Sequence, residues 1–141
     1  MTQTVSIRFD KGFDLDTWLR FYHACDWNRD NTVHNLAVMR DHAYLIATAW
    51  KGESMVGTLT VLSDGLNYAT IDDLVVHPAH RHQGIGSQMM HAALARLGAI
   101  DPSVIKLNAV PGVEPFYTRL GFEASNETAM YLRERPASDP S

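Results

Sequence analysis

The stretch that decides the fold reads LVVHPAHRHQGIG, residues 74–86. Its first three residues are apolar, and such continuity predicts a strand that is buried on both faces. Pro78 ends that strand, because proline has no N–H for a strand ladder. Beyond the two glycines, apolar residues recur at helical spacing until Gly98 ends the pattern; they are Ile85, Met89, Met90, Ala93, Leu94 and Leu97. The sequence therefore predicts a buried strand, a glycine-containing loop and an amphipathic helix, in that order.

The loop between this strand and this helix has the features of an anion site. Gly84 and Gly86 let the backbone bend tightly and leave its N–H groups uncovered. The following helix presents unpaired N–H donors and the positive end of its macrodipole. Arg81 and His82 add charge and Ser87 adds a hydroxyl, so the loop predicts a site for a phosphate or pyrophosphate. A glycine turn that only ends a strand is the simpler alternative.

Two familiar nucleotide-binding loops do not fit this stretch. A dinucleotide fingerprint, G-x-G-x-x-G, needs a third glycine where Met89 stands. A P-loop needs Gly-Lys-Ser/Thr, and the sequence has no lysine between Lys51 and Lys106. The spacing that remains is Arg-x-x-Gly-x-Gly.

The rest of the chain predicts further elements on both sides of this stretch. Asp14 or Asp16 can cap a first helix, and Thr32 can cap a second one that ends near Arg40. Strands are predicted for residues 5–9, 43–50, 55–62, 67–77 and 104–109, with a short helix over 115–120 and a final strand within 122–132, clearest at 129–132. This order predicts one mixed α/β (α+β) domain over residues 1–134, largely antiparallel in its first half, and a flexible tail over residues 135–141.

Composition and charge narrow the classes of function. The net charge is −4, so neither a nucleic acid nor a membrane is expected as a partner. The acidic balance is compatible with a cationic substrate, but solubility explains it as well. No window approaches the ~18 apolar residues of a membrane span, and no signal peptide is apparent. Cys25 is the only cysteine, which fits a reducing compartment and a cytoplasmic protein.

Two motifs resemble the signatures of a known family. Leu74 to Pro78, followed by Arg81-x-x-Gly84-Ile85-Gly86, resembles the acetyl-CoA-binding signature of the GNAT superfamily of N-acetyltransferases. Residues 116–122, FYTRLGF, resemble the second signature of that family, an aromatic-Tyr-x-x-Leu-Gly-Phe helix. His82 departs from the pattern, because the family often has glycine there. The resemblance implies a GNAT-like acyl-CoA N-acyltransferase fold, with a mostly antiparallel central sheet that is splayed at the cofactor site and flanked by about four helices.

The resemblance also implies how acetyl-CoA, the co-substrate, would bind. Backbone groups of Leu74 and Val76 would pair with the pantetheine arm as with an extra strand, and an N–H near Val75 would polarise the thioester carbonyl. Asn108 could hydrogen-bond the cofactor from the facing strand, although an exposed asparagine at a strand end is as good an explanation. The pyrophosphate would lie on the backbone N–H groups of Arg81, His82, Gln83, Gly84, Ile85, Gly86 and Ser87. No histidine or carboxylate spacing is typical of a metal site, so no metal is expected.

Acetyl transfer needs an acid near the departing thiolate and a proton acceptor near the attacking amine. Tyr117 matches the position of the family's usual acid, and a buried aromatic beside Phe116 is the alternative. Asp72 and Asp73 are candidates for the base. Because adjacent residues of a strand point to opposite faces, only one of them is expected to face the acceptor. The reaction implied is direct attack by a primary amine in a ternary complex.

The acceptor is the least defined part of the sequence-based hypothesis. In the family, its pocket is usually built by the first two helices, their loop and the last strands. Here this implies Trp27 and Asn31 in the loop, with Tyr22 behind it. Trp27 could equally be a packing anchor for the loop. A small amine is the expected acceptor, a homodimer is compatible with the family, and a CoA-sensing domain without turnover is the alternative function.

Overall fold

The computed structural model of the chain describes residues 4–134. These residues belong to two compact units, one that runs through Asn108 and one that starts at Ala109. The expected flexible tail, 135–141, lies outside the described residues. That residues 1–134 act as one domain stays a prediction.

The first unit is built on a five-stranded sheet with the order β1-β2-β3-β4-β5. The strands are β1 (Val5–Arg8), β2 (Leu45–Lys51), β3 (Ser54–Ser63), β4 (Tyr68–Val76) and β5 (Val104–Leu107). The first four strands are antiparallel to their neighbours, and β5 joins β4 in parallel. The prediction of a mixed, mostly antiparallel sheet is therefore confirmed.

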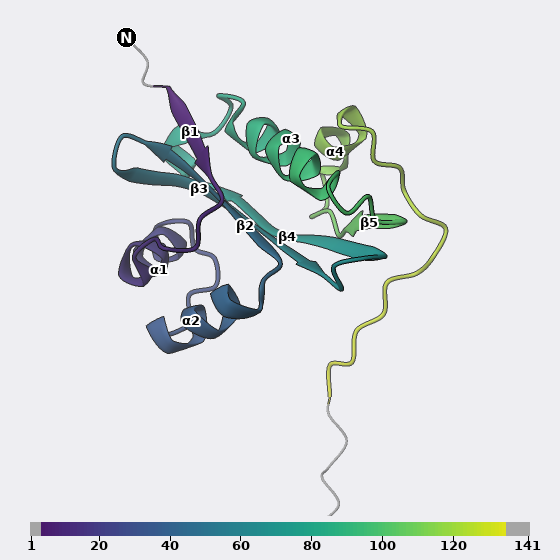
Figure 1. Cartoon of the computed structure of the whole chain (residues 1–141), viewed down its shortest axis with the longest axis horizontal. Coiled ribbons are helices and arrows are strands. Elements are labelled where there is room, and N and C mark those ends of the chain that lie inside the picture. The colour runs from purple at the N-terminus through teal and green to yellow at the C-terminus, as the bar shows by residue number, and fades with distance from the viewer. Residues whose placement is uncertain (1–3, 135–141) are drawn as a thin grey trace, which may run out of the picture. The chain divides into compact units, whose positions relative to one another are not determined.

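Three helices cover the two faces of this sheet. They are α1 (Leu15–Ala24), α2 (Val33–His42) and α3 (Ile85–Leu97). Figure 1 shows α1 and α2 on one face and α3 on the other. Both predicted N-caps are present, since Asp14 Oδ2 accepts a hydrogen bond from Thr17 N and Thr32 Oγ1 accepts one from Asn35 N, each at 3.1 Å.

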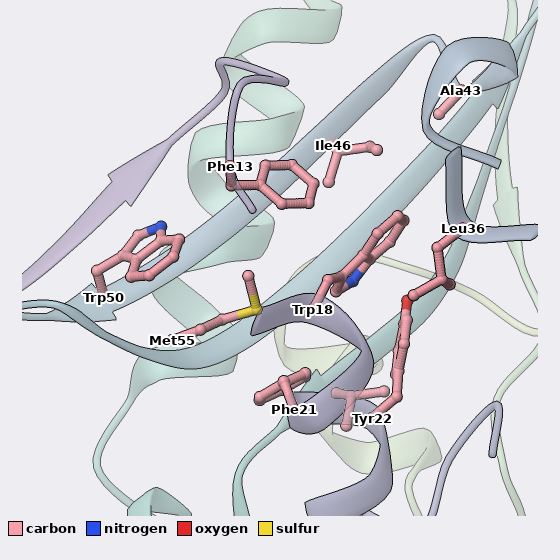
Figure 2. Close-up of a cluster of buried hydrophobic side chains, with 10 residues drawn as sticks. Phe13, Trp18, Phe21, Tyr22, Leu36, Ala43, Ile46, Trp50 and Met55 are labelled. Carbon is pink, nitrogen blue, oxygen red and sulfur yellow. The ribbon is translucent and has the colours of Figure 1, made fainter. Parts of the chain in front are cut away.

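Each face of the sheet has its own apolar cluster. The cluster beneath α1 and α2 is aromatic-rich (Figure 2) and contains Phe13, Trp18, Phe21, Tyr22, Leu36, Ala43, Ile46, Trp50, Met55 and Val75. The cluster beneath α3 contains Ala49, Val56, Ile85 and Met89, with Leu74 and Val76 packed against it. The centre of β4 thus contacts both clusters, as its continuous apolar run predicts.

The sheet opens between β4 and β5. Parallel pairing runs from Tyr68 and Val104 to Ile71 and Leu107 and ends there. On its other side β4 stays paired with β3 as far as Val76, which faces Gly57. Residues 72–76 of β4 therefore have a strand neighbour on one side only among the residues that the structure describes. This is the splay that the fold prediction includes. A short 3-10 helix, η1 (Pro78–His80), connects the end of β4 to the glycine loop.

Within residues 109–134 the second unit contains one helix, α4 (Glu114–Arg119), close to the predicted 115–120. The predicted final strand is wrong, because residues 122–132, all described, form no strand. Met130, Tyr131 and Leu132 are 90%, 62% and 66% exposed. Alternating apolar residues become a strand only when a neighbouring strand supplies the ladder bonds, and the alternation itself does not provide that neighbour.

Gly57 of β3 lies against Met89 of α3. A Cβ added there would lie 2.6 Å from Met89 Cε and 3.3 Å from Ala49 Cβ. Because Met89 is fully buried, we expect Gly57→Val to lower the free energy of unfolding by about 1–3 kcal/mol in urea titrations. Gly12→Ala is the control, since its added Cβ would meet Asp10 Oδ1 at an ordinary 3.5 Å. Equal unfolding midpoints for Gly57→Val and wild type would contradict this packing.

Candidate active site

A β-bulge interrupts β4 just after the sheet opens. Thr60 of β3 pairs with Asp72, and Thr58 pairs with Val75. The single residue between the two threonines therefore faces two residues of β4, Asp73 and Leu74. Asp73 has φ +54°, in the left-handed region that residues other than glycine seldom adopt. The extra residue resets which side chains of β4 point to which face.

Because of this bulge, Asp72 and Asp73 lie on the same side of the sheet. Both line a pocket of about 370 Å³ that we call the acid pocket. Its walls are Val38, Met39 and His42 of α2, Thr60 and Leu62 of β3, and the two aspartates. The expectation that the two carboxylates point to opposite faces is wrong, since regular alternation does not continue through a bulge.

The two carboxylates of the acid pocket have different surroundings. Burial, and then the negative charge of Asp73, raises the pKa of Asp72 above its ordinary value. Asp73 instead accepts two hydrogen bonds from the α1–α2 loop: Trp27 Nε1 donates to Oδ1 at 3.1 Å, and Asn28 Nδ2 donates to Oδ2 at 3.4 Å. The pKa of Asp72 is thus raised, while the carboxylate of Asp73 fastens the loop.

The loop that Asp73 fastens contains two of the residues predicted to bind the acceptor, Trp27 and Asn31, and the third, Tyr22, lies on α1. Trp27 is 39% exposed, and its backbone N donates to Tyr22 O at 3.0 Å. Asn31 Oδ1 accepts from Asn35 Nδ2 of α2 at 3.5 Å. Tyr22 is fully buried, and burial, followed by the charge of Asp73, raises the pKa of its phenol. Trp27 therefore meets the acid pocket through Asp73, Tyr22 lies inside the core, and Asn31 lies against α2.

The predicted phosphate loop has an open helix N-terminus. Gly84, at φ +81°, precedes α3 and has no side chain to cap it. The first bond of the helix runs from Gln88 N to Gly84 O at 3.0 Å, so the N–H groups of Ile85, Gly86 and Ser87 precede it. His82 has φ +62° and so keeps the tight turn that glycine often makes in the family. These donors suit the oxygens of a phosphate.

Two side chains organise this loop. Arg81 Nε donates to Val76 O at 3.1 Å, which ties the loop back to the end of β4. Lys51 Nζ, at the end of β2, donates to Gln83 Oε1 at 2.6 Å. Lys51 was not predicted to lie at this loop, because a lysine in a turn gives no sign of a partner 32 residues away. Its ammonium adds a positive charge beside the loop.

The remaining two predicted residues lie at the end of the first unit and in the second. Asn108 follows β5 directly and is exposed. Tyr117 lies on α4, with its ring centre 5.0 Å from that of Phe116 and 6.1 Å from that of Phe122. Burial raises the pKa of Tyr117, so the phenol keeps its proton at neutral pH.

Within residues 4–134 no group of three or more His, Cys, Asp or Glu side chains could hold a metal ion. No helix in the same range is both long enough and apolar enough to cross a bilayer.

Comparison with known proteins identifies a family that the chain matches. The sequence model of the "Acetyltransferase (GNAT) domain" matches residues 22–131. The chain is 35% identical over 144 residues to GCN5-related N-acetyltransferase 2, chloroplastic, of Arabidopsis thaliana, covering 86% of this chain and 55% of that protein. It is 34% identical over 87 residues to the uncharacterized N-acetyltransferase ycf52 of Porphyra purpurea, covering 60% of this chain and 50% of that protein. The chain thus spans about half the length of these curated relatives.

One solved structure has the same fold as this chain over nearly the full length of both. The GNAT family acetyltransferase from Streptococcus pneumoniae superposes with a TM-score of 0.81 at 27% sequence identity. The superposition covers 94% of this chain and 100% of that chain.

The opposite surroundings of two aspartates lead to opposite effects on stability. Asp72 has a raised pKa, so its ionised form weakens the folded state as the pH rises through that pKa. Asp64 has a pKa lowered by backbone N–H groups of Tyr68, Leu66 and Asn67, so its ionised form stabilises the folded state. At pH 7 we expect Asp72→Asn to raise the urea midpoint and Asp64→Ala to lower it. The difference in urea midpoint between each variant and wild type should become smaller below the usual pKa of aspartate. If both variants changed the midpoint in the same direction at pH 7, the surroundings described for Asp72 and Asp64 would be contradicted.

Proposed function

Because the chain belongs to the GNAT acetyltransferase family, we propose that it transfers the acetyl group of acetyl-CoA to a primary amine. The observation that carries this proposal is the open edge of β4, residues 72–76, which is followed by the short 3-10 helix η1 (Pro78–His80) and then by the loop 81–87. An open strand edge offers hydrogen bonds to an extended chain, and the helix N-terminus after it suits a phosphate. Acetyl-CoA has both parts in one molecule.

The donor would lie along this edge and this loop. The amide groups of its pantetheine arm would pair with the backbone of Leu74 and Val76. Val76 O already accepts from Arg81 Nε, but a carbonyl oxygen has two lone pairs and can accept a second hydrogen bond. The pyrophosphate would take the N–H groups from Arg81 to Ser87, with the ammonium of Lys51 close by. An N–H near Val75 would hydrogen-bond the thioester oxygen as negative charge develops on it.

The chemistry would be direct attack in a ternary complex. The amine nitrogen forms a bond to the thioester carbonyl carbon, and the carbon–sulfur bond breaks. Asp72, rather than Asp73, would accept the amine's proton, because its pKa is raised and both oxygens of Asp73 hold the loop. Tyr117 would give its proton to the departing thiolate, because its position matches that of the family's usual acid and a phenol carries its proton at neutral pH.

The acid pocket would receive the acceptor. Its two carboxylates attract a cationic amine, and Val38, Met39 and Leu62 offer an apolar wall to the rest of the molecule. Trp27 and Asn31 would border the approach, with Tyr22 beneath them. A pocket of about 370 Å³ suits a small amine. The cytoplasmic location and a homodimer remain expectations of the sequence, and one relative is named as chloroplastic.

Ligand binding tests the donor directly. We expect calorimetry to detect acetyl-CoA and CoA, with NAD and ATP much weaker, because the site combines a strand edge with a pyrophosphate loop. Tighter binding of NAD or ATP than of CoA would overturn the proposal. A thiol-release screen against a panel of amines then identifies the acceptor, and CoA binding without turnover on any amine would favour a CoA-sensing domain.

Replacing the proposed acid should affect the chemical step more than binding. We expect Tyr117→Phe to lower kcat by roughly 100-fold or more, since general acids contribute about 10²–10⁴-fold. The dissociation constant for acetyl-CoA should change little. Tyr68→Phe, the same change on an exposed ring at the start of β4, is the matched control. A kcat for Tyr117→Phe equal to wild type across the pH range would remove Tyr117 from the acid role.

A further inference from the structure

His42, the last residue of α2, lines the acid pocket together with Asp72 and Asp73. The other side chains that line this pocket do not titrate; they are Val38, Met39, Thr60 and Leu62. Three side chains of the pocket can therefore accept a proton, and they are two carboxylates and one imidazole.

A hydrogen bond fixes which ring nitrogen of His42 is available to the pocket. Nδ1 lies 2.9 Å from the backbone oxygen of Val38, one turn earlier in α2. Because a carbonyl oxygen only accepts, Nδ1 carries a proton and donates this hydrogen bond. In the neutral imidazole the other nitrogen, Nε2, then has a lone pair and no proton. The polar atom that His42 has left for a molecule in the pocket is therefore a proton acceptor.

The imidazole and the two carboxylates differ in their access to solvent and in their other contacts. Both oxygens of Asp73 accept hydrogen bonds from the α1–α2 loop, at 3.1 Å and 3.4 Å. Asp72 is half-buried and belongs to the open edge of β4, along which the thioester would lie. His42 is exposed, so its ring can exchange a proton with bulk water.

The proposed reaction removes two protons from the amine nitrogen. A primary amine is an ammonium ion at neutral pH, with three protons on its nitrogen. The amide product has one proton there, so two must leave in each turnover. One of them is balanced by the proton that Tyr117 gives to the sulfur, and the other is released to water. The carboxylate of Asp72 can take only one proton at a time.

We propose that His42 Nε2 takes the first of these protons and is a second base of the reaction, an inference that rests on the proposed function. The ammonium gives this proton to Nε2 in the pocket, which frees the lone pair of its nitrogen for attack. Asp72 takes the second proton as the carbon–nitrogen bond forms and the carbon–sulfur bond breaks. The exposed imidazolium then passes its proton to water, and exchange with water restores Asp72 and Tyr117.

Replacing His42 should slow the reaction without weakening the binding of the donor. We expect His42→Gln, whose side chain is polar but accepts no proton, to lower kcat by about 100-fold, the lower end of the effect of a general base. The Kd for acetyl-CoA should not change, because the strand edge and the glycine loop are untouched. His34→Gln is the matched control, since His34 is exposed on the same helix and does not line the pocket. A kcat for His42→Gln equal to that of the control would overturn the inference.

Added imidazole separates proton transfer from a merely structural role of His42. His42→Ala removes the ring, and the exposed position lets free imidazole reach the space that the ring leaves. Imidazole in the buffer should therefore raise the kcat of His42→Ala severalfold and leave the kcat of wild type and of His34→Ala unchanged. A low kcat for His42→Ala that imidazole does not raise would show a structural role and overturn the inference.

The tautomer of His42 can be measured without any acceptor. Heteronuclear NMR of the neutral ring should show the proton on Nδ1, with the His42 signals identified by their loss in His42→Gln. A proton on Nε2 in place of Nδ1 would overturn the inference. A wild-type chain that binds CoA but acetylates no amine would overturn the proposed function and this inference with it, whereas an active wild type with an equally active His42→Gln overturns this inference alone.

Discussion

The arrangement of the candidate site depends on one extra residue in β4. The bulge at Asp73 turns two neighbouring aspartates toward the same pocket, where a regular strand would separate them. Burial of Asp72, and then the negative charge of Asp73 beside it, raises the pKa of Asp72. The bulge also comes directly after the last pair between β4 and β5, at Ile71. Proton chemistry and the open strand edge therefore arise within the same few residues.

The unusual backbone at the bulge is compensated by contacts from the α1–α2 loop. Asp26 and Asn28 have φ values of +55° and +50°, so the loop, like Asp73, departs from the common conformations. The hydrogen bonds from Trp27 and Asn28 to Asp73 join these segments. Neither segment has a regular ladder to fix it there, and each limits the conformations open to the other. Such mutual restraint is a usual way to hold catalytic groups in sparsely populated geometry.

Periodicity and capping residues were sufficient to predict most elements and the glycine loop, because these are local signals. Asp14 and Thr32 begin the helices that they were predicted to cap. The sequence did not predict that Asp72 and Asp73 share one face. The side chains that hydrogen-bond Asp73 in the bulge, Trp27 and Asn28, are 46 and 45 positions away in the sequence. Lys51 was not predicted for the same reason. The strand predicted within 122–132 is wrong for the opposite reason. The local pattern is present there, but the long-range pairing that a strand requires is not.

The open edge of β4 has a consequence for association as well as for binding. Unpaired N–H and C=O groups along a strand edge can pair with the same edge of another molecule, which is a route to aggregation. Here the edge begins with two carboxylates beside a bulge. Two such edges brought together would place four negative charges side by side, and the bulge would spoil their register. The residues proposed to receive a cationic amine therefore also discourage the molecule from pairing with itself.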